Sequence, residues 1–393
     1  MNYILFDGPV RDNLLPFTFI RPVADIRIGI LTIREKWEKY LGNTTTTITE
    51  DYLSEKYPMV EMAGNILINA SFLPNQKLVD LVVGLQENEA IFQGEEVVAF
   101  YVRETQEEVD FSSYKTIDYK DGTLRVAHTW DIFEKNAEAL EADFELITAG
   151  RTSAPISKSN TLICPERIFA EAGARVEHSI LNATEGPIYL GKNSEVWEGN
   201  LIRGAFALCE RAVVKMGAMI YGATTVGPWS KVCGEISNAV IFGYSSKGHD
   251  GYLGNSVLGE WCNIGASSNN SNLKNNYAKV RLWNYATESF EQTGLQFCGL
   301  MMGDHSKTAI NTMFNTGTVI GVNCNIYDPG FPRNFVPSFS WGGATGFTTY
   351  LPKKAFEAAE VMMERRHVPF DEKEARILEH VFELTKRWRN YKV

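Results

Sequence analysis

"LGKNSEVWEGNLIRGAFALCERAVVKMGAMIYGATTVGPWSKV", residues 190–232, carries an aliphatic side chain at every sixth position. Small or polar residues stand two positions before most of these aliphatics, and glycines separate many of the units. Six-residue units of this kind are typical of a parallel β-helix, in which three short strands form one coil and the inward aliphatics stack into a continuous core. The eight aliphatics are Leu190, Val196, Ile202, Leu208, Val214, Ile220, Val226 and Val232.

The same period extends the predicted array in both directions, from about Leu162 to Phe331, which corresponds to roughly eight coils. It runs through Leu162, Ile168, Ala174 and Ile180, resumes at Val240, Leu258 and Ile264, and ends with Thr308, Phe314, Ile320 and Ile326. It fails over 273–298, where apolar and polar residues alternate around Asn284, so we expect a hairpin that projects from a coil. The predicted β-helix domain is 160–350.

The ends of the chain have other patterns. Residues 1–151 are expected to form a mixed α/β domain, in which "YILFD" and "NILINA" are buried strands. Helices are predicted at 28–42, ending at Gly42, and at 129–148. Residues 352–393 have helical spacing interrupted by Pro369, which predicts two closing helices.

Composition excludes several function classes. The 393 residues contain 38 Lys and Arg against 48 Asp and Glu, a net charge of -10, which disfavours nucleic acid and anionic lipid as partners. No run approaches the ~18 apolar residues of a membrane span and the N-terminus lacks a leader pattern, so a cytoplasmic protein is expected. The six cysteines are far apart without a CxxC pair, so neither a disulfide framework nor a metal site is predicted.

One segment of the array suggests a chemistry. "SKGHDGYLGNSVLGEWCNIGA", residues 246–266, resembles the left-handed β-helix domain of the bifunctional N-acetylglucosamine-1-phosphate uridyltransferase/glucosamine-1-phosphate N-acetyltransferase family, and the resemblance covers about 185–330. It implies a left-handed coil, with His249 as the general base that accepts a proton from a sugar amine attacking acetyl-CoA. It also implies sugar contacts from Tyr252, a position near the acetyl group for Asn263, and a substrate amide at Asn272.

The sequence departs from that family at two places. Ser237 falls near the position of the family's phosphate-binding lysine, and Leu273 replaces the tyrosine that should follow Asn272. Lys247, Lys231 and Arg203 remain as candidate phosphate ligands, although such residues are often only solvated. His305 is a second candidate base, because Asp304 beside it could orient the imidazole. The family likeness further implies a homotrimer with coenzyme A between neighbouring chains.

The N-terminal segment Arg11–Trp37 resembles the first turn of sugar-phosphate nucleotidyltransferases, but most of that family's glycines are missing. Val23 stands where the lysine is expected, and Ala70 replaces the metal-binding aspartate. Arg11, Arg21 and Arg27 are candidate contacts for a nucleoside triphosphate, and Mg²⁺ would be needed if this domain is active.

Three hypotheses follow. The first is an acetyl-CoA-dependent N-acetyltransferase acting on an amino-sugar 1-phosphate, most simply glucosamine 1-phosphate, in sugar-nucleotide biosynthesis. The second is a sugar-1-phosphate nucleotidyltransferase whose β-helix serves oligomerisation. The third is a non-catalytic protein that binds a sugar nucleotide.

Overall fold

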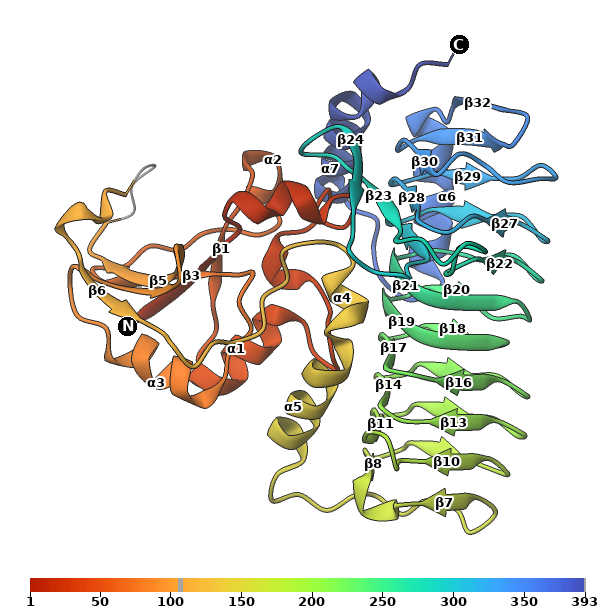
Figure 1. Ribbon diagram of the computed structural model, residues 1–393, viewed down its shortest axis with the longest axis horizontal. Coiled ribbons are helices and arrows are strands. Elements are labelled where there is room, and N and C mark those ends of the chain that lie inside the picture. Colours follow the sequence, from red (N-terminus) through yellow and green to blue (C-terminus); the bar gives the residue numbers. More distant parts are fainter. Residues whose placement is uncertain (105–108, 392–393) are drawn as a thin grey trace.

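The computed structural model describes residues 1–104 and 109–391. It contains an N-terminal mixed α/β domain, a parallel β-helix and two C-terminal helices (Figure 1). The coils of the β-helix stack into a tall column, and the N-terminal domain lies beside this column at the level of its middle and upper coils.

The N-terminal domain is built on one six-stranded sheet of order β2-β1-β3-β5-β4-β6. Strands β1, β2 and β3 are parallel, whereas β5 runs antiparallel to both β3 and β4. The carboxyl ends of β1, β2 and β3 therefore meet at one edge, where α/β sheets bind ligands. The strands are β1 (Asn2–Phe6), β2 (Thr46–Ile48), β3 (Asn65–Asn69), β4 (Glu89–Gln93), β5 (Glu96–Val102) and β6 (Lys115–Asp118).

The two helices predicted in this domain are both shorter than expected. Helix α1 (Ile33–Leu41) begins only after Thr32, whose side chain forms a capping box with Glu35, and it ends at Gly42 in the left-handed region. The second predicted helix is divided at Lys135 into α4 (Asp131–Glu134) and α5 (Asn136–Thr148). Within its described residues the domain also contains the α-helices α2 (Asp51–Ser54) and α3 (Gln76–Gly84) and three short 3-10 helices.

The β-helix has three faces, each a parallel ladder, which we call faces A, B and C in chain order around a coil. Face A contains β7 (Thr161–Ile163), β10 (Ile180–Asn182), β13 (Leu201–Arg203), β16 (Met219–Tyr221), the first parts of β19 (Glu235–Gly243) and β21 (Tyr252–Glu260), β22 (Asn269–Asn270) and β27 (Met313–Phe314).

Face B contains β8 (Ile168–Ala170), β11 (Ile188–Leu190), β14 (Phe206–Leu208), β17 (Thr224–Val226), the second parts of β19 and β21, β25 (Leu300–Met302), β28 (Thr318–Ile320) and β30 (Phe335–Val336). Face C contains β9 (Arg175–Val176), β12 (Glu195–Val196), β15 (Val213–Val214), β18 (Lys231–Val232), β20 (Ser246–Lys247), β26 (Lys307–Thr308), β29 (Asn325–Ile326) and β31 (Ser340–Gly343). An isolated bridge at Asn263 continues face C between β20 and β26.

The six-residue period correctly located the interior of the β-helix. All eight aliphatics from Leu190 to Val232 are at most 2% exposed and belong to its inner core. At two outlying positions the prediction was wrong by one residue, since Leu181 rather than Ile180 and Ile241 rather than Val240 face inward. A one-residue shift moves a side chain to the opposite face of a strand.

The array is also longer than predicted, because face B has nine strands. The inward residue of its last strand β30, Val336, lies ten residues beyond Ile326 and falls outside the six-residue period. In the segment 273–298, β23 (Arg281–Asn284) pairs with β24 (Ser289–Gln292) as an antiparallel hairpin. A second hairpin joins β31 to β32 (Gly346–Thr349) at the end of the array.

Face B carries the N-terminal domain. Its outward residues Val240, Phe242 and Val257 share one apolar core with the N-terminal domain, and the rings of Phe17 and Phe242 lie 5.2 Å apart. Helix α4 contacts β19 and β21. The two domains are therefore joined by a continuous buried core.

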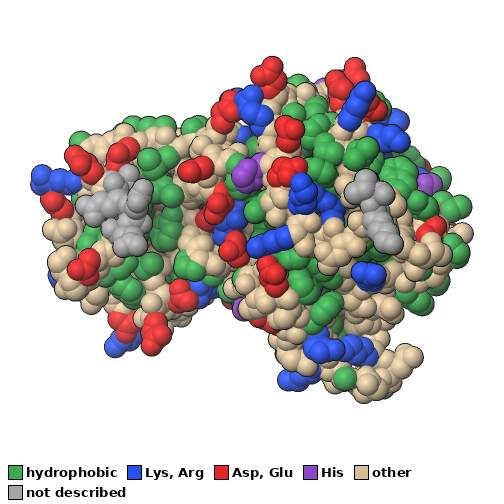
Figure 2. All heavy atoms as spheres, turned by 90° about the horizontal axis from the view of Figure 1, so that it is seen from above, with side chains coloured by type: hydrophobic (Ala, Val, Ile, Leu, Met, Phe, Trp, Pro, Cys, Tyr) green, Lys and Arg blue, Asp and Glu red, His purple; other side chains and the backbone are tan. Residues whose placement is uncertain are grey.

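The C-terminal helices α6 (Pro352–Glu364) and α7 (Glu372–Leu384) lie beside the upper coils (Figure 1). Helix α7 also reaches the N-terminal domain, where His380 stacks on Tyr52 with ring centroids 4.1 Å apart. From above, acidic and basic side chains are interspersed over this end of the molecule (Figure 2). Within the described ranges, none of the helices combines the length and apolar character that a bilayer span requires.

Candidate functional site

His249 lies on the corner between faces C and A, in the turn that joins β20 to β21. Its side chain is exposed. The turn is tight because Gly251 has a φ of 114°, and a Cβ there would lie 2.0 Å from the carbonyl oxygen of Ser268. Only glycine fits such a close approach between successive coils. The imidazole is therefore carried on a turn whose backbone is fixed by its neighbours.

Lys247 lies inside the β-helix beneath this turn. It pairs with inward-facing Val232, is 2% exposed, and donates from Nζ to the carbonyl oxygens of Cys233 (3.0 Å) and His249 (2.7 Å). Burial lowers the pKa of Lys247 to about 8. Lys215 Nζ donates to the carbonyl of Gly248 at 2.8 Å. Two amines thus hold two consecutive carbonyls of the turn, and the amine of Lys247 is directed to backbone instead of an open phosphate site.

A hydrogen-bonded cluster on face A joins the coil of Tyr252 to the next coil. The Tyr252 hydroxyl accepts from Asn272 Nδ2 at 2.9 Å, and the same nitrogen lies 2.8 Å from Asn255 Oδ1. The ring of Tyr252 extends over Gly254, where a Cβ would be 2.2 Å from the hydroxyl. The structure therefore brings Tyr252 and Asn272 together, whereas Asn263 bridges β20 and β26 on face C.

A pocket of about 510 Å³ follows directly on Asn272, at the corner between faces A and B. Lys274 and Arg281 supply two cations, and none of the lining residues is a carboxylate. Sequence reasoning missed these two residues, although "LKNNYAKVR" marks them as a basic run in the interrupted part of the period. The lining residues are Ser271, Leu273, Lys274, Asn275, Arg281, Phe290, Asn315, Thr316 and Asn334.

The other candidate phosphate ligands lie elsewhere on the β-helix. Arg203 is on face A, where it pairs with Glu185 at 2.7 Å. It borders an apolar groove of about 490 Å³ that includes Leu201, Met219 and Tyr221. Lys231 is exposed on face C. Neither cation lines the pocket beside Asn272.

His305 lies on the corner between faces B and C and is 1% exposed. Its ring is stacked with Trp261 at a centroid distance of 6.2 Å, and neither imidazole nitrogen has a partner among the described residues. Burial lowers the pKa of His305 well below its usual range, so the ring is neutral near pH 7. The neighbouring Asp304 binds Arg21.

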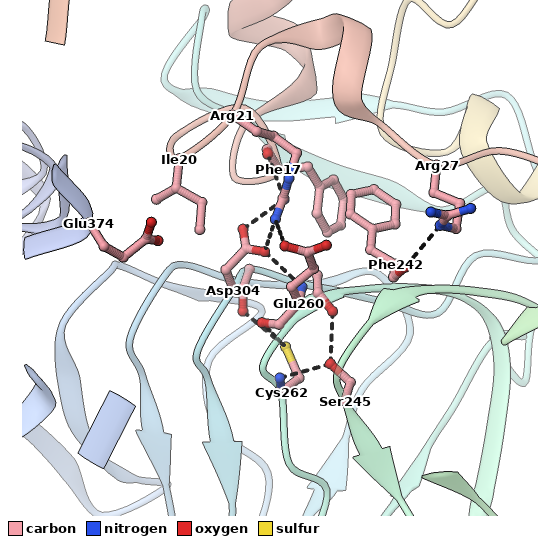
Figure 3. A network of polar contacts seen from close by, with 12 residues as sticks. Phe17, Ile20, Arg21, Arg27, Phe242, Ser245, Glu260, Cys262, Asp304 and Glu374 are labelled. Carbon is pink, nitrogen blue, oxygen red and sulfur yellow. Dashed lines mark hydrogen bonds and ion pairs between the residues drawn. The ribbon is translucent and has the colours of Figure 1, made fainter. Parts of the chain in front are cut away.

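Arg21 and Arg27, two arginines of the segment Arg11–Trp37, are directed into the protein (Figure 3). Arg21 is 3% exposed and binds Asp304 Oδ1 at 2.6 Å and Glu260 Oε2 at 2.9 Å. Arg27 donates to the carbonyl of Phe242 at 3.0 Å. Both side chains thus connect the N-terminal domain to the β-helix.

Arg11 remains at the carboxyl edge of the N-terminal sheet, 3.4 Å from Asp7. Asp7 accepts hydrogen bonds from Val23 N at 2.7 Å and from Thr49 Oγ1 at 2.6 Å. Burial raises the pKa of Asp7 to about 6. Across residues 1–104 and 109–391, no cluster of three or more His, Cys, Asp or Glu side chains is placed to hold a metal ion.

Known proteins resemble parts of the chain. Residues 3–152 match the family model described as sugar nucleotidyl transferase. A segment of 92 residues is 32% identical to the bifunctional protein GlmU of Methanocaldococcus jannaschii and covers 23% of this chain. The match spans only 21% of that relative's length.

Among solved structures, the UDP-N-acetylglucosamine acyltransferase of Campylobacter jejuni is similar over 60% of this chain and 83% of its own. The sequence identity is 14% and the TM-score is 0.17, a value too low to establish a common fold. The N-terminal domain thus matches the sugar nucleotidyl transferase family model over residues 3–152, and a parallel β-helix follows it in the chain.

Proposed function

We propose that this protein is an acetyl-CoA-dependent N-acetyltransferase acting on an amino-sugar 1-phosphate, with glucosamine 1-phosphate as the first substrate to test. The observation that carries the proposal is the arrangement along face A. An exposed imidazole, His249, lies at one end of the strand, and the Tyr252–Asn272 pair leads from it to a pocket with two cations and no carboxylate. The hydroxyl groups of a sugar phosphate can hydrogen-bond to Tyr252 and Asn272, and its phosphate can pair with the cations of the pocket.

His249 acts as general base in this proposal. A sugar amine must be neutral to attack a thioester, and an imidazole can accept its proton near neutral pH. Lys215 holds the carbonyl of Gly248 and Lys247 holds that of His249. The backbone that carries the imidazole is thus fixed, which restricts the positions that the ring can reach. Tyr252 and Asn272 would orient the sugar, and Lys274 and Arg281 its phosphate.

Acetyl-CoA would supply the thioester as the second substrate. The apolar groove on face A fits the apolar part of such a donor, because Leu201, Met219 and Tyr221 are each at least 40% exposed there. Exposed apolar columns of this kind are also suited to contacts between copies of the chain. We therefore propose a homotrimer in which a neighbouring chain covers face A and completes the donor site.

The test is an assay of acetyl transfer from acetyl-CoA to glucosamine 1-phosphate, in which the release of free thiol is measured. His249→Ala should lower kcat/KM about 10²- to 10⁴-fold without changing the melting temperature. His178→Ala is the matched control, because His178 is also exposed and lies on the same corner, between faces C and A, in a lower coil. If His305→Ala loses the activity while His249→Ala keeps it, His305 is the base.

A second candidate function is nucleotidyl transfer by the N-terminal domain, which the match of residues 3–152 favours. Asp7 and Arg11 at the carboxyl edge of the sheet would be its polar groups. Arg21 and Arg27, however, are engaged by the β-helix. Pyrophosphate release from UTP or dTTP with a sugar 1-phosphate and Mg²⁺ would establish this activity, and sugar-nucleotide binding without either reaction would leave the non-catalytic hypothesis.

A further inference from the structure

The corner between faces B and C repeats one backbone conformation from coil to coil. A residue with φ between 53° and 61° occupies this corner in eight successive coils, so the side chains project in the same direction and form a column. The column consists of Asn193, Arg211, Trp229, Tyr244, Trp261, His305, Asn323 and Phe339.

The upper part of this column is covered by other parts of the chain. Tyr244 and Trp261 stack at 4.3 Å, and His305 continues the stack. Arg389 lies over the ring of Phe339 at 5.9 Å. The upper column from Trp261 to Phe339 is therefore buried, and it ends beneath Arg389 of the C-terminal segment.

The lower end of the column is open. Arg211 lies over the ring of Trp229, 4.9 Å from its centroid, and both residues line a groove of about 560 Å³. We call this the B–C groove; its other lining residues are Gly173, Arg175, Asn193, Glu195, Val213, Lys231 and Arg366.

The B–C groove has a surplus of positive charge in a chain whose net charge is -10. Its four cations are Arg175, Arg211, Lys231 and Arg366, and Glu195 is its one carboxylate. Glu195 is already engaged by Arg175 and by Trp197 Nε1, the latter at 2.9 Å. Arg211 lies 3.7 Å from the exposed Glu210, which is outside the groove, so the groove keeps a surplus of positive charge.

Arg366 gives a second indication of a ligand. Its Nε is buried and has no hydrogen-bond partner among the described residues. An unpaired buried donor is costly, and such a group is usually satisfied by a bound molecule or water. Burial and the adjacent Arg365 lower the pKa of Arg366, which an anion in the groove would reverse.

We propose that the B–C groove binds a phosphorylated small molecule through a diphosphate group. Guanidinium groups match phosphate oxygens in paired hydrogen bonds, and a groove of about 560 Å³ is within the size range of small-molecule sites. This site is independent of the proposed acetyl transfer, because none of its residues lines the pocket beside Asn272 or carries the His249 turn.

Binding would also join two parts of the chain. Arg366 follows helix α6, whereas Arg211 and Lys231 belong to the coils of the β-helix. A diphosphate held by both groups ties the C-terminal segment to the lower coils, so it should raise the melting temperature of the whole protein.

The test is calorimetric titration of the full-length protein with inorganic pyrophosphate and, separately, with ADP. We expect saturable binding that weakens at least tenfold in the double variant R211A/K231A, and a rise in melting temperature that the variant lacks. Lys77→Ala is the control, because Lys77 is an exposed lysine of the N-terminal domain. Tighter binding of ADP than of pyrophosphate would show that a nucleotide occupies the groove, and equal binding would show that the diphosphate suffices. No saturable binding of either anion, or equal affinity in the double variant, overturns the proposal.

Discussion

Arg21 is the residue whose removal should most clearly weaken the union of the two domains. Its guanidinium binds Asp304 at 2.6 and 3.1 Å and Glu260 at 2.9 Å, and lies 5.3 Å from the ring centroid of Phe242. Asp304 is 0% exposed. Arg21→Met fills similar volume but leaves that carboxylate without its cation, which should reduce the free energy of unfolding by about 3–5 kcal/mol.

The loss should depend on pH in a defined direction. Burial already raises the pKa of Asp304 above its ordinary value of 3.8, and Arg21 opposes this shift. Without Arg21 the pKa of Asp304 rises further, so folding of the variant favours the protonated form of this carboxyl group. An acid whose pKa is raised by folding contributes stability at low pH and loses it as pH rises, so the deficit of Arg21→Met should grow from about pH 4 towards neutrality.

Urea titration followed by tryptophan fluorescence measures both effects. Arg203→Met is the matched control, because the Arg203–Glu185 pair is exposed and should be worth less than about 1 kcal/mol. Adding Asp304→Asn to Arg21→Met should restore part of the stability, since the neutral amide oxygen can still accept from Glu260 N. A single variant as stable as the control, or a double variant less stable than the single one, would refute the reasoning.

Three further predictions concern the β-helix. Folding lowers the pKa of His305, so the free energy of unfolding should fall as pH drops below 6.5, the usual pKa of histidine. His305→Phe should make this fall less steep between pH 7.5 and 5, as measured by urea titration. An unchanged slope would contradict the buried neutral ring. Lys247→Met should lower kcat for acetyl transfer about 10- to 100-fold and speed amide hydrogen exchange in residues 248–251. Unchanged exchange would show that the amine of Lys247 does not hold the turn of His249. Gly254→Ala should displace the Tyr252 hydroxyl and raise KM for the amino sugar about fivefold, the equivalent of ~1 kcal/mol, and an unaltered KM would separate Tyr252 from substrate binding.

The candidate site could be predicted only where it follows from local pattern. The run around His249 identifies an exposed corner, and the structure brings Asn272 within hydrogen-bond distance of Tyr252. Lys274 and Arg281 were missed because their pocket forms between the hairpin and corners contributed by Asn315 and Asn334, which are distant in sequence. Spacing along one chain segment carries no information about such a meeting.

The sequence by itself determined the β-helix, because each coil repeats the same short-range requirement for an inward aliphatic, and the residues from Leu190 to Val232 meet it without help from the rest of the chain. Only the tertiary structure decided the surroundings of the charged residues. Arg21 and Asp304 are 283 positions apart, and the N-terminal domain must dock on face B before they meet. Lys247 is hidden for a related reason: its inward position lies fifteen residues after Val232, out of step with the six-residue period, and only strand register shows that its amine points beneath His249.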